Sequence, residues 1–423
     1  MFQTLKTVTI FSLLILFPYI SGANNAVFEF TSDTIFRAFE RENQSGDSLQ
    51  VLPIYEYISI DYGDIEKIGF SMHLHGWARA DLGDGDYFEK DSDGELLYGY
   101  IDYTPATETY NIKVGRQHLF AGVVNDSFDG LGVGGLAGDY VRLNAFGGIP
   151  TAYEEDNGRS GDGIIGGRLA ITFNPSTEFG VSHKYISDDD TTVENTSGMD
   201  SSIFLTRFLS VYGLSSWNHE TDGWREHTYE ADMYMGPLLL NPSFQMIQYD
   251  DFFDDNQMGS QLFQYLQETE EELTIMGADL IWQIAFNLEL GLRLKQYEYD
   301  QRSENSQYYA ALLNVKTDSA TQYGLEAGSM IGESDYDRYT LYRGYLYWDA
   351  PFEFLESWFI SSELLVVNYQ EEIYGQDRSL FYSLGCGKEL IADRFKFSLS
   401  GDYSSDPYFD DDLRVMLVGT FTY

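Results

Sequence analysis

Phe286-Asn287-Leu288-Glu289-Leu290-Gly291-Leu292-Arg293-Leu294-Lys295 alternates strictly between apolar side chains and polar or absent ones. Successive side chains of a β-strand point to opposite faces, so this stretch predicts a strand with one apolar face and one charged face. The same alternation recurs along most of the chain, for example in residues 68–79, 322–327 and 395–402. We count roughly eighteen to twenty-two such segments of about ten residues, which predicts an all-β chain folded as a transmembrane antiparallel up-and-down β-barrel. A soluble sandwich would have shorter strands and would not carry both charge signs along its outer face.

The composition narrows the class of protein further. The 423 residues include 25 Lys and Arg against 68 Asp and Glu, a net charge of −43 that excludes nucleic acid as a partner. The chain is rich in aromatic residues, with 33 Tyr and 29 Phe, and contains one cysteine, Cys386. A single cysteine excludes a disulfide scaffold and a covalent haem attachment within this chain. The remaining classes are a membrane β-barrel and a secreted β-rich protein.

The first segment has the features of a secretory signal. Lys6 precedes an apolar run at residues 8–20, and the small residues Ser21, Gly22 and Ala23 follow it. This order predicts a signal peptide over residues 1–23 that is cleaved, which leaves residues 24–423 as a single transmembrane barrel. No later stretch approaches the ~20 apolar residues of a membrane-spanning helix, which excludes a helical membrane protein.

Short and long connections alternate between the expected strands. Short links at residues 104–107, 174–176, 236–237, 318–320 and 350–351 are typical of periplasmic turns. The other connections are long and acidic, and we expect them to be extracellular loops; they cover residues 81–94, 148–162, 188–200, 250–272, 370–378 and 406–412. Short and long connections alternate along the whole chain, and the barrel can close, only if residues 136–139 join two strands as a hairpin and residues 27–40 form the first strand.

The last residues form one more alternating strand, and the chain stops on an aromatic side chain. Leu413, Val415, Leu417, Gly419, Phe421 and Tyr423 share one face. This strand resembles the terminal strand of Gram-negative outer-membrane barrels, where an aromatic residue, usually Phe, ends the chain. The resemblance implies a location in the cell outer membrane, contact with its lipid and lipopolysaccharide, and recognition of Phe421 and Tyr423 by the barrel assembly machinery.

A second resemblance covers about thirty residues. Gly115, Arg116 and Gln117 end one strand, and Asp129 and Gly130 begin the next. This pattern is similar to one seen in porins of the substrate-specific and polysaccharide-export type. There the following loop folds inward and narrows the channel, which makes residues 118–127 the candidate constriction. Alternatively, Arg116 pairs with neighbouring carboxylates at the mouth of the barrel.

The polar faces of the clearer strands are expected to line the lumen. They carry nine basic residues, which we call the basic ladder: Arg79, Lys113, Arg142, Arg168, Arg293, Lys295, Arg343, Lys396 and Arg414. Glu289, Glu326 and Asp402 lie among them. Rings of charge in a pore set ion selectivity, but the same residues could instead only pair with their neighbours.

No pattern in the sequence indicates a catalytic site or a metal site. The acidic clusters either form a solvated loop surface or bind Ca²⁺ or Mg²⁺ against lipopolysaccharide, and none has the spacing of a calcium-binding loop, so we predict no metal ligand. Only His73 and His75 share a strand face among the histidines, as lumen side chains. We therefore expect no catalytic residue, no cofactor and no enzyme activity.

These features favour a porin-like channel for the passive diffusion of small hydrophilic solutes or ions. A barrel of about twenty strands is wide, and this chain has no segment left to plug it. It therefore also resembles the porin component of porin–cytochrome conduits, in which the barrel sheathes a multihaem cytochrome. A secreted β-rich surface protein or adhesin is the third possibility, although it would not explain the terminal strand.

Overall fold

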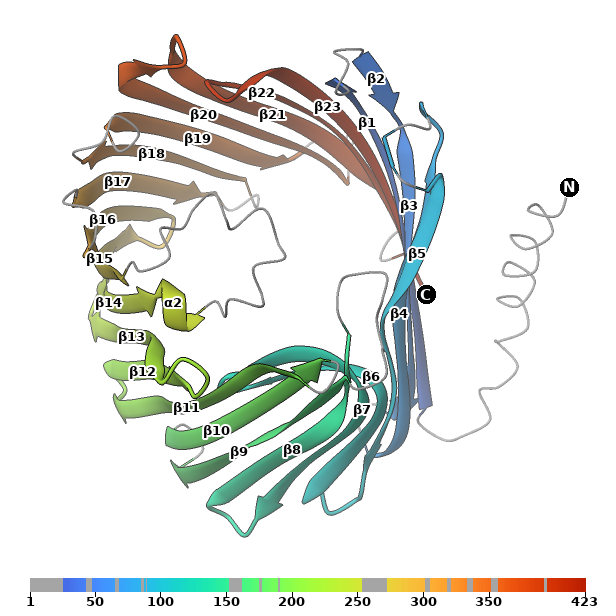
Figure 1. Cartoon of the computed structure of the whole chain (residues 1–423). Coiled ribbons are helices and arrows are strands. Elements are labelled where there is room, and N and C mark those ends of the chain that lie inside the picture. Colours follow the sequence, from blue (N-terminus) through green and yellow to red (C-terminus); the bar gives the residue numbers. More distant parts are fainter. Residues whose placement is uncertain are drawn as a thin grey trace, which may run out of the picture.

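The computed structural model describes residues 26–42, 48–64, 68–84, 87–88, 90–151, 162–174, 177–188, 191–252, 272–300, 305–317, 321–332, 338–350, 357–391 and 394–423. The segment expected to be a signal peptide, residues 1–23, lies outside these ranges and stays a prediction. Nearly all described residues belong to strands: β1 (Ala26–Glu42), β2 (Ser48–Val51), β3 (Pro53–Asp64), β4 (Gly69–Asp81), β5 (Ser92–Thr104), β6 (Tyr110–Ala121), β7 (Val124–Ala137), β8 (Val141–Pro150), β9 (Gly163–Asn174), β10 (Thr177–Asp188), β11 (Thr191–Thr206), β12 (Leu209–Asn218), β13 (Gly223–Met235), β14 (Leu238–Gln248), β15 (Glu272–Ala285), β16 (Leu288–Tyr299), β17 (Ser306–Lys316), β18 (Gln322–Ile331), β19 (Tyr339–Asp349), β20 (Trp358–Ile373), β21 (Gln376–Ile391), β22 (Phe395–Asp406) and β23 (Phe409–Thr422). One short helix, α2 (Tyr249–Phe252), lies inside the ring of strands (Figure 1).

The strands close into a barrel. From β3 onward each strand pairs antiparallel with the next in the sequence, and β1 pairs with β2, β3 and β23. β2 and β3 lie along the same neighbour, β1, and are separated only at Leu52, so they occupy one position in the wall. The result is a closed barrel of 22 strands, which confirms the predicted fold class and strand number. Because β1 pairs with β23, the sheet has no edge strand at its ends, as a membrane-spanning sheet requires.

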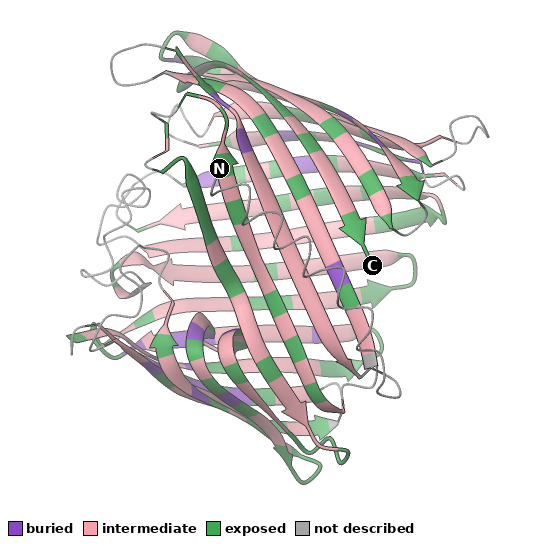
Figure 2. Cartoon of the chain, turned by 90° about the vertical axis from the view of Figure 1, so that its right-hand side faces the viewer, coloured by how far each residue is buried: buried purple, intermediate pink, exposed green. Residues whose placement is uncertain are grey.

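The apolar parity of each strand faces outward. In β16, Leu290, Leu292 and Leu294 are 37%, 54% and 50% exposed, whereas Arg293 on the other parity contacts lumen residues. Figure 2 shows that exposed residues recur on neighbouring strands on one side of the wall. Many of the exposed residues of the barrel are large and apolar. So much exposed apolar surface on one face marks a membrane-facing surface. Among the described residues, no helix is long and apolar enough to cross a membrane, a finding that concerns helices alone.

This outward face predicts the effect of a charge in the apolar band. Leu292→Arg is expected to lower the free energy of unfolding by about 2 to 4 kcal/mol, because an arginine near the middle of the hydrocarbon layer loses its hydration. Leu292→Ala is the matched control and should cost less, since it removes the side chain without adding a charge. The measurement is denaturant unfolding in lipid vesicles. Equal losses for both variants would contradict the assignment of Leu292 to lipid.

Most of the expected connections are present. β1 is the predicted first strand, and β7 and β8 form the predicted hairpin through residues 138–140. Short links occur at residues 105–109 and 236–237. They lie at the end of the barrel where β1 begins and β23 ends, which we call the terminal end. Of the other predicted short links, residues 318–320 lie outside the described residues, and residues 174–176 and 350–351 lie partly outside them. The assignment of the terminal end to the periplasm stays a prediction.

Three acidic segments expected to be loops are strands instead. Residues 191–200 belong to β11, residues 370–378 form the end of β20, a turn and the start of β21, and most of residues 406–412 belong to β22 and β23. The backbone ladder of these strands continues past the apolar band, where acidic side chains are tolerated. The expected loops at residues 148–162 and 250–272 lie largely outside the described residues.

Candidate functional site: the lumen and its inward-folded hairpin

Two neighbouring strands leave the wall near their loop end, which is the end opposite the terminal end. β6 pairs with β5 only over residues 112–116 and then separates from it. The separation begins at Gly115, which has a φ of 124°, and a Cβ there would lie 2.3 Å from the carbonyl oxygen of Gly99. Only glycine fits this conformation and this close approach. β6 and β7 remain paired up to their tip at residues 122–123, so they leave the wall as a hairpin.

The hairpin folds inward over the wall formed by β8–β11. Val124 and Phe128 are fully buried against Phe146 of β8 and Ile164 of β9, which are 4% and 2% exposed. The wall residues beneath the hairpin are on the parity opposite to the outward Val181, which is 52% exposed. Figure 1 shows β6 and β7 curving across the inside of these strands. Residues 118–127 therefore narrow the lumen from one side, as the resemblance implied, but as the tip of a strand hairpin and not as a loop.

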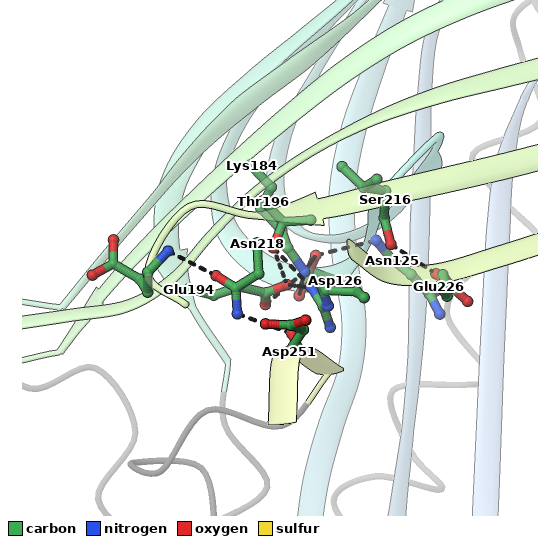
Figure 3. Close-up of polar contacts among 12 residues, drawn as sticks. Asn125, Asp126, Lys184, Glu194, Thr196, Ser216, Asn218, Glu226 and Asp251 are labelled. Atoms are coloured by element: carbon green, nitrogen blue, oxygen red, sulfur yellow. Dashed lines mark hydrogen bonds and ion pairs between the residues drawn. The ribbon is translucent and has the colours of Figure 1, made fainter. Parts of the chain in front are cut away.

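Buried ion pairs fix the hairpin to the wall. Asp126 of the hairpin lies 3.0 Å from the Nζ atom of Lys184 in β10, and the same Nζ lies 2.8 Å from Glu194 in β11. Arg225 of β13 pairs with the other oxygen of Glu194. Lys184 is 6% exposed. Figure 3 shows Asp126, Lys184 and Glu194 converging with polar residues of β12 and β13. Because a buried charge without its partner is costly, this network holds the hairpin in one position.

The tip of the hairpin is seated with little free space. The backbone N–H of Val123 donates to Ser182 Oγ at 3.0 Å. Gly122 has a φ of 64°, and a Cβ at this position would lie 2.2 Å from Ser182 Oγ. A larger residue at position 122 would therefore lift the tip from the wall.

The residues of the second sequence motif lie at the base of the hairpin. Arg116 donates two hydrogen bonds of 2.9 Å to the carboxylate of Asp129 and one of 2.8 Å to the carbonyl oxygen of Leu96. Glu95 lies 3.7 Å from the same guanidinium group. A two-pronged contact of this kind fixes the orientation of both partners.

The same motif also fills the base of the hairpin. Gln117 is 3% exposed and donates to the carbonyl oxygen of Gly130, on the strand that faces it. Gly115 and Gly130 let the backbones approach, since a Cβ at Gly130 would lie 2.2 Å from the carbonyl oxygen of Gly147. The five motif residues thus form the bend from which the hairpin turns inward.

The basic ladder is mostly a series of ion pairs. Six of its nine members lie within 4.0 Å of a carboxylate on the lumen parity: Lys113 with Asp102, Arg142 with Glu178, Arg168 with Glu178 and Asp200, Arg293 with Asp279 and Glu326, Arg343 with Glu363, and Arg414 with Asp412. Arg79 and Lys396 instead lie over the rings of Phe88 and Phe359. Lys295 forms no ion pair within the part of the chain that the structure describes.

The three predicted acidic lumen residues have different partners. Glu326 accepts a hydrogen bond from Tyr308 and lies near Arg293. Glu289 accepts one from Asn314. Asp402 stands opposite Arg414 in the register of β22 and β23. Within the described ranges, no group of three or more His, Cys, Asp or Glu side chains is placed to hold a metal ion.

Several lumen residues could not be found from the sequence. Lys184 and Glu194 fall on the inward parity of β10 and β11, and Arg225 lies at an irregularity in the pairing of β12 with β13, which a count of alternating residues does not predict. These residues meet only because the hairpin covers them. Since Asp126 and Arg225 are far apart in the sequence, their contact network could not be predicted from it. A parity count would have found Asp279 and Glu363, each next to a recognised lumen residue in the sheet.

Comparison with known proteins supports the fold. No family model and no curated protein matches the sequence. Among solved structures, the translocation pore of the P pilus usher PapC is similar over 93% of this chain and 99% of that one, with 8% identity and a TM-score of 0.50. OccAB2 of Acinetobacter baumannii (95% and 99%, 9% identity, TM-score 0.49) and OccK8 of Pseudomonas aeruginosa (94% and 98%, 9% identity, TM-score 0.46) are also similar. At these identities the likeness concerns the fold, a large closed barrel of the outer-membrane type.

Proposed function

We propose that this outer-membrane β-barrel is a porin-like channel through which small hydrophilic solutes or ions diffuse passively. The observation that carries the proposal is the inward-folded hairpin of β6 and β7, which narrows the lumen and is fixed by Asp126, Lys184 and Glu194. A polar lumen with a fixed constriction selects solutes by width and charge and requires no chemistry.

We further propose that the channel prefers cations. The paired members of the basic ladder are neutralised at close range, so they leave little positive field for a passing ion. The chain as a whole carries a net charge of −43. Carboxylates such as Glu289, whose described partner is the neutral Asn314, keep their negative potential in the lumen. A lumen field of this sign raises the local concentration of cations.

Reversal potentials in planar lipid bilayers test both proposals. With a salt gradient across the purified protein, the reversal potential should have the sign of cation selectivity, and it should shrink as salt rises and screens the charges. Glu289→Gln should move it toward zero, whereas Asn314→Asp at the neighbouring position should move it further toward cations. Anion selectivity would contradict the proposed preference. Haem that copurifies with the protein, together with absent conductance, would favour the barrel that sheathes a cytochrome.

A further inference from the structure

The lumen face of β3, β4 and β5 carries a continuous row of aromatic rings. Neighbouring rings lie 5.2 to 6.4 Å apart between centroids and connect in the order Trp77, Tyr55, Tyr57, His75, Tyr98 and Tyr100. We call these six residues the ring row. All six lie on the inward parity, because the residues between them include the outward Leu74 and Ile101, which are 38% and 53% exposed.

Rings of the ring row that face each other across neighbouring strands are close to parallel. His75 and Tyr98 are directly opposite in the register and are inclined by only 19°, and Tyr57 is inclined by 26° to His75. None of the six residues is buried, so their rings are accessible from the lumen. A tyrosine edge combines apolar C–H groups with a hydroxyl that both donates and accepts hydrogen bonds. The row therefore offers alternating apolar and hydrogen-bonding contacts along the wall.

The charges that border the ring row balance. Arg37 lies 5.4 Å from the ring centroid of Tyr55, and Lys113 lies 5.0 Å from that of Tyr100. Asp102 lies 3.9 Å from Lys113, and Asp61 contacts His73 at 2.5 Å. Because charges of both signs border the row, it gives neither an anion nor a cation a clear advantage.

We infer that the ring row is a binding track for neutral, polyhydroxylated solutes of the carbohydrate class. Such solutes carry apolar C–H faces and hydroxyl groups at short intervals, which match the ring edges and tyrosine hydroxyls. They also match the bordering charged groups, since these donate and accept hydrogen bonds without requiring a charge on the ligand. This inference rests on the proposed channel function and adds the class of solute.

Block of the ion current by added sugar tests the inference. Maltotriose is expected to produce brief, concentration-dependent interruptions of the current through the wild-type protein. Tyr57→Ala and Tyr98→Ala should each weaken the apparent affinity about threefold to tenfold, the loss expected for one aromatic contact. Tyr57→Phe, which keeps the ring, should lose less. Tyr345→Ala is the matched control, because Tyr345 is a lumen tyrosine on the distant strand β19, bonded to Asn314, and should leave block unchanged.

Charged derivatives of glucose test whether the ring row prefers neutral solutes over ionic ones. Glucose should bind more strongly than gluconate or glucosamine at the same concentration. Stronger binding of gluconate or glucosamine than of glucose would overturn the inference, and so would unchanged maltotriose block in both alanine variants. In either case a measurable conductance would still support the proposed channel function. Heat-modifiable migration on gels confirms that each variant is a folded barrel. If the wild type does not conduct, titration calorimetry with maltotriose in detergent decides separately whether the ring row binds sugar.

Discussion

Deletion of Phe421, Thr422 and Tyr423 is expected to reduce the folded protein in the outer membrane to near background, with unfolded material left behind in the periplasm. These residues complete the contact between the first and last strands. Tyr423 and Phe30 exchange two backbone hydrogen bonds of 3.0 and 2.8 Å, and Thr422 donates one of 2.8 Å to Arg394. Without them β1 has unpaired backbone groups at the membrane, each of which costs several kcal/mol. Cell fractionation and immunoblotting measure the outcome.

Single substitutions distinguish closure of the barrel from recognition of the aromatic end. Tyr423→Ala keeps the backbone bonds but removes the ring, which lies 6.3 Å from that of Phe28. A loss as large as that of the deletion would show that the ring itself is recognised during assembly. Tyr423→Phe should restore normal levels, because the ring is retained. Normal outer-membrane levels of the truncated protein would contradict both roles of the terminal strand.

Lys184→Met is expected to release the hairpin of β6 and β7 and to raise the single-channel conductance. The substitution leaves the partly buried Asp126, whose side chain is 19% exposed, without its cation. Loss of one partner of a fully buried pair costs about 3 to 5 kcal/mol, which is the upper limit of the expected loss here. Glu194 keeps Arg225, so the wall itself should remain intact. Hydrogen exchange of residues 118–127 should rise together with the conductance and the current noise.

The double variant Asp126→Asn with Lys184→Met is the matched control. It removes both charges at their contact, so the hairpin should be held better than in Lys184→Met alone, and the coupling in the double-mutant cycle should be large. Gly122→Val offers a test without any charge, because its side chain would collide with Ser182 at the tip. Wild-type conductance and exchange in both Lys184→Met and Gly122→Val would show that the hairpin is not fixed by this contact.

Alternation alone determined the architecture. Side chains of a strand alternate between two faces, and a closed membrane barrel requires one apolar face on every strand. The alternation of residues such as Leu290, Leu292 and Leu294 is therefore enough to predict that they face lipid. The terminal strand could be recognised for the same reason. The acidic stretches in β11, at the junction of β20 and β21, and in β22 and β23 were expected to be loops, because a strand outside the apolar band loses the alternation that identifies it.

The functional geometry depended on the tertiary structure. Gly115, Arg116 and Asp129 could be identified as a motif, but the direction in which β6 and β7 turn is decided by the burial of Val124 and Phe128 on a wall that is distant in sequence. The basic ladder could be assigned to the lumen from parity, whereas its pairing could not, because a carboxylate partner is set by strand neighbours and register. Whether a residue faces lipid or the lumen could thus be predicted from the alternation, since that choice is local. Only the closed structure decided which charges cancel and what narrows the channel, because those contacts join residues from different strands.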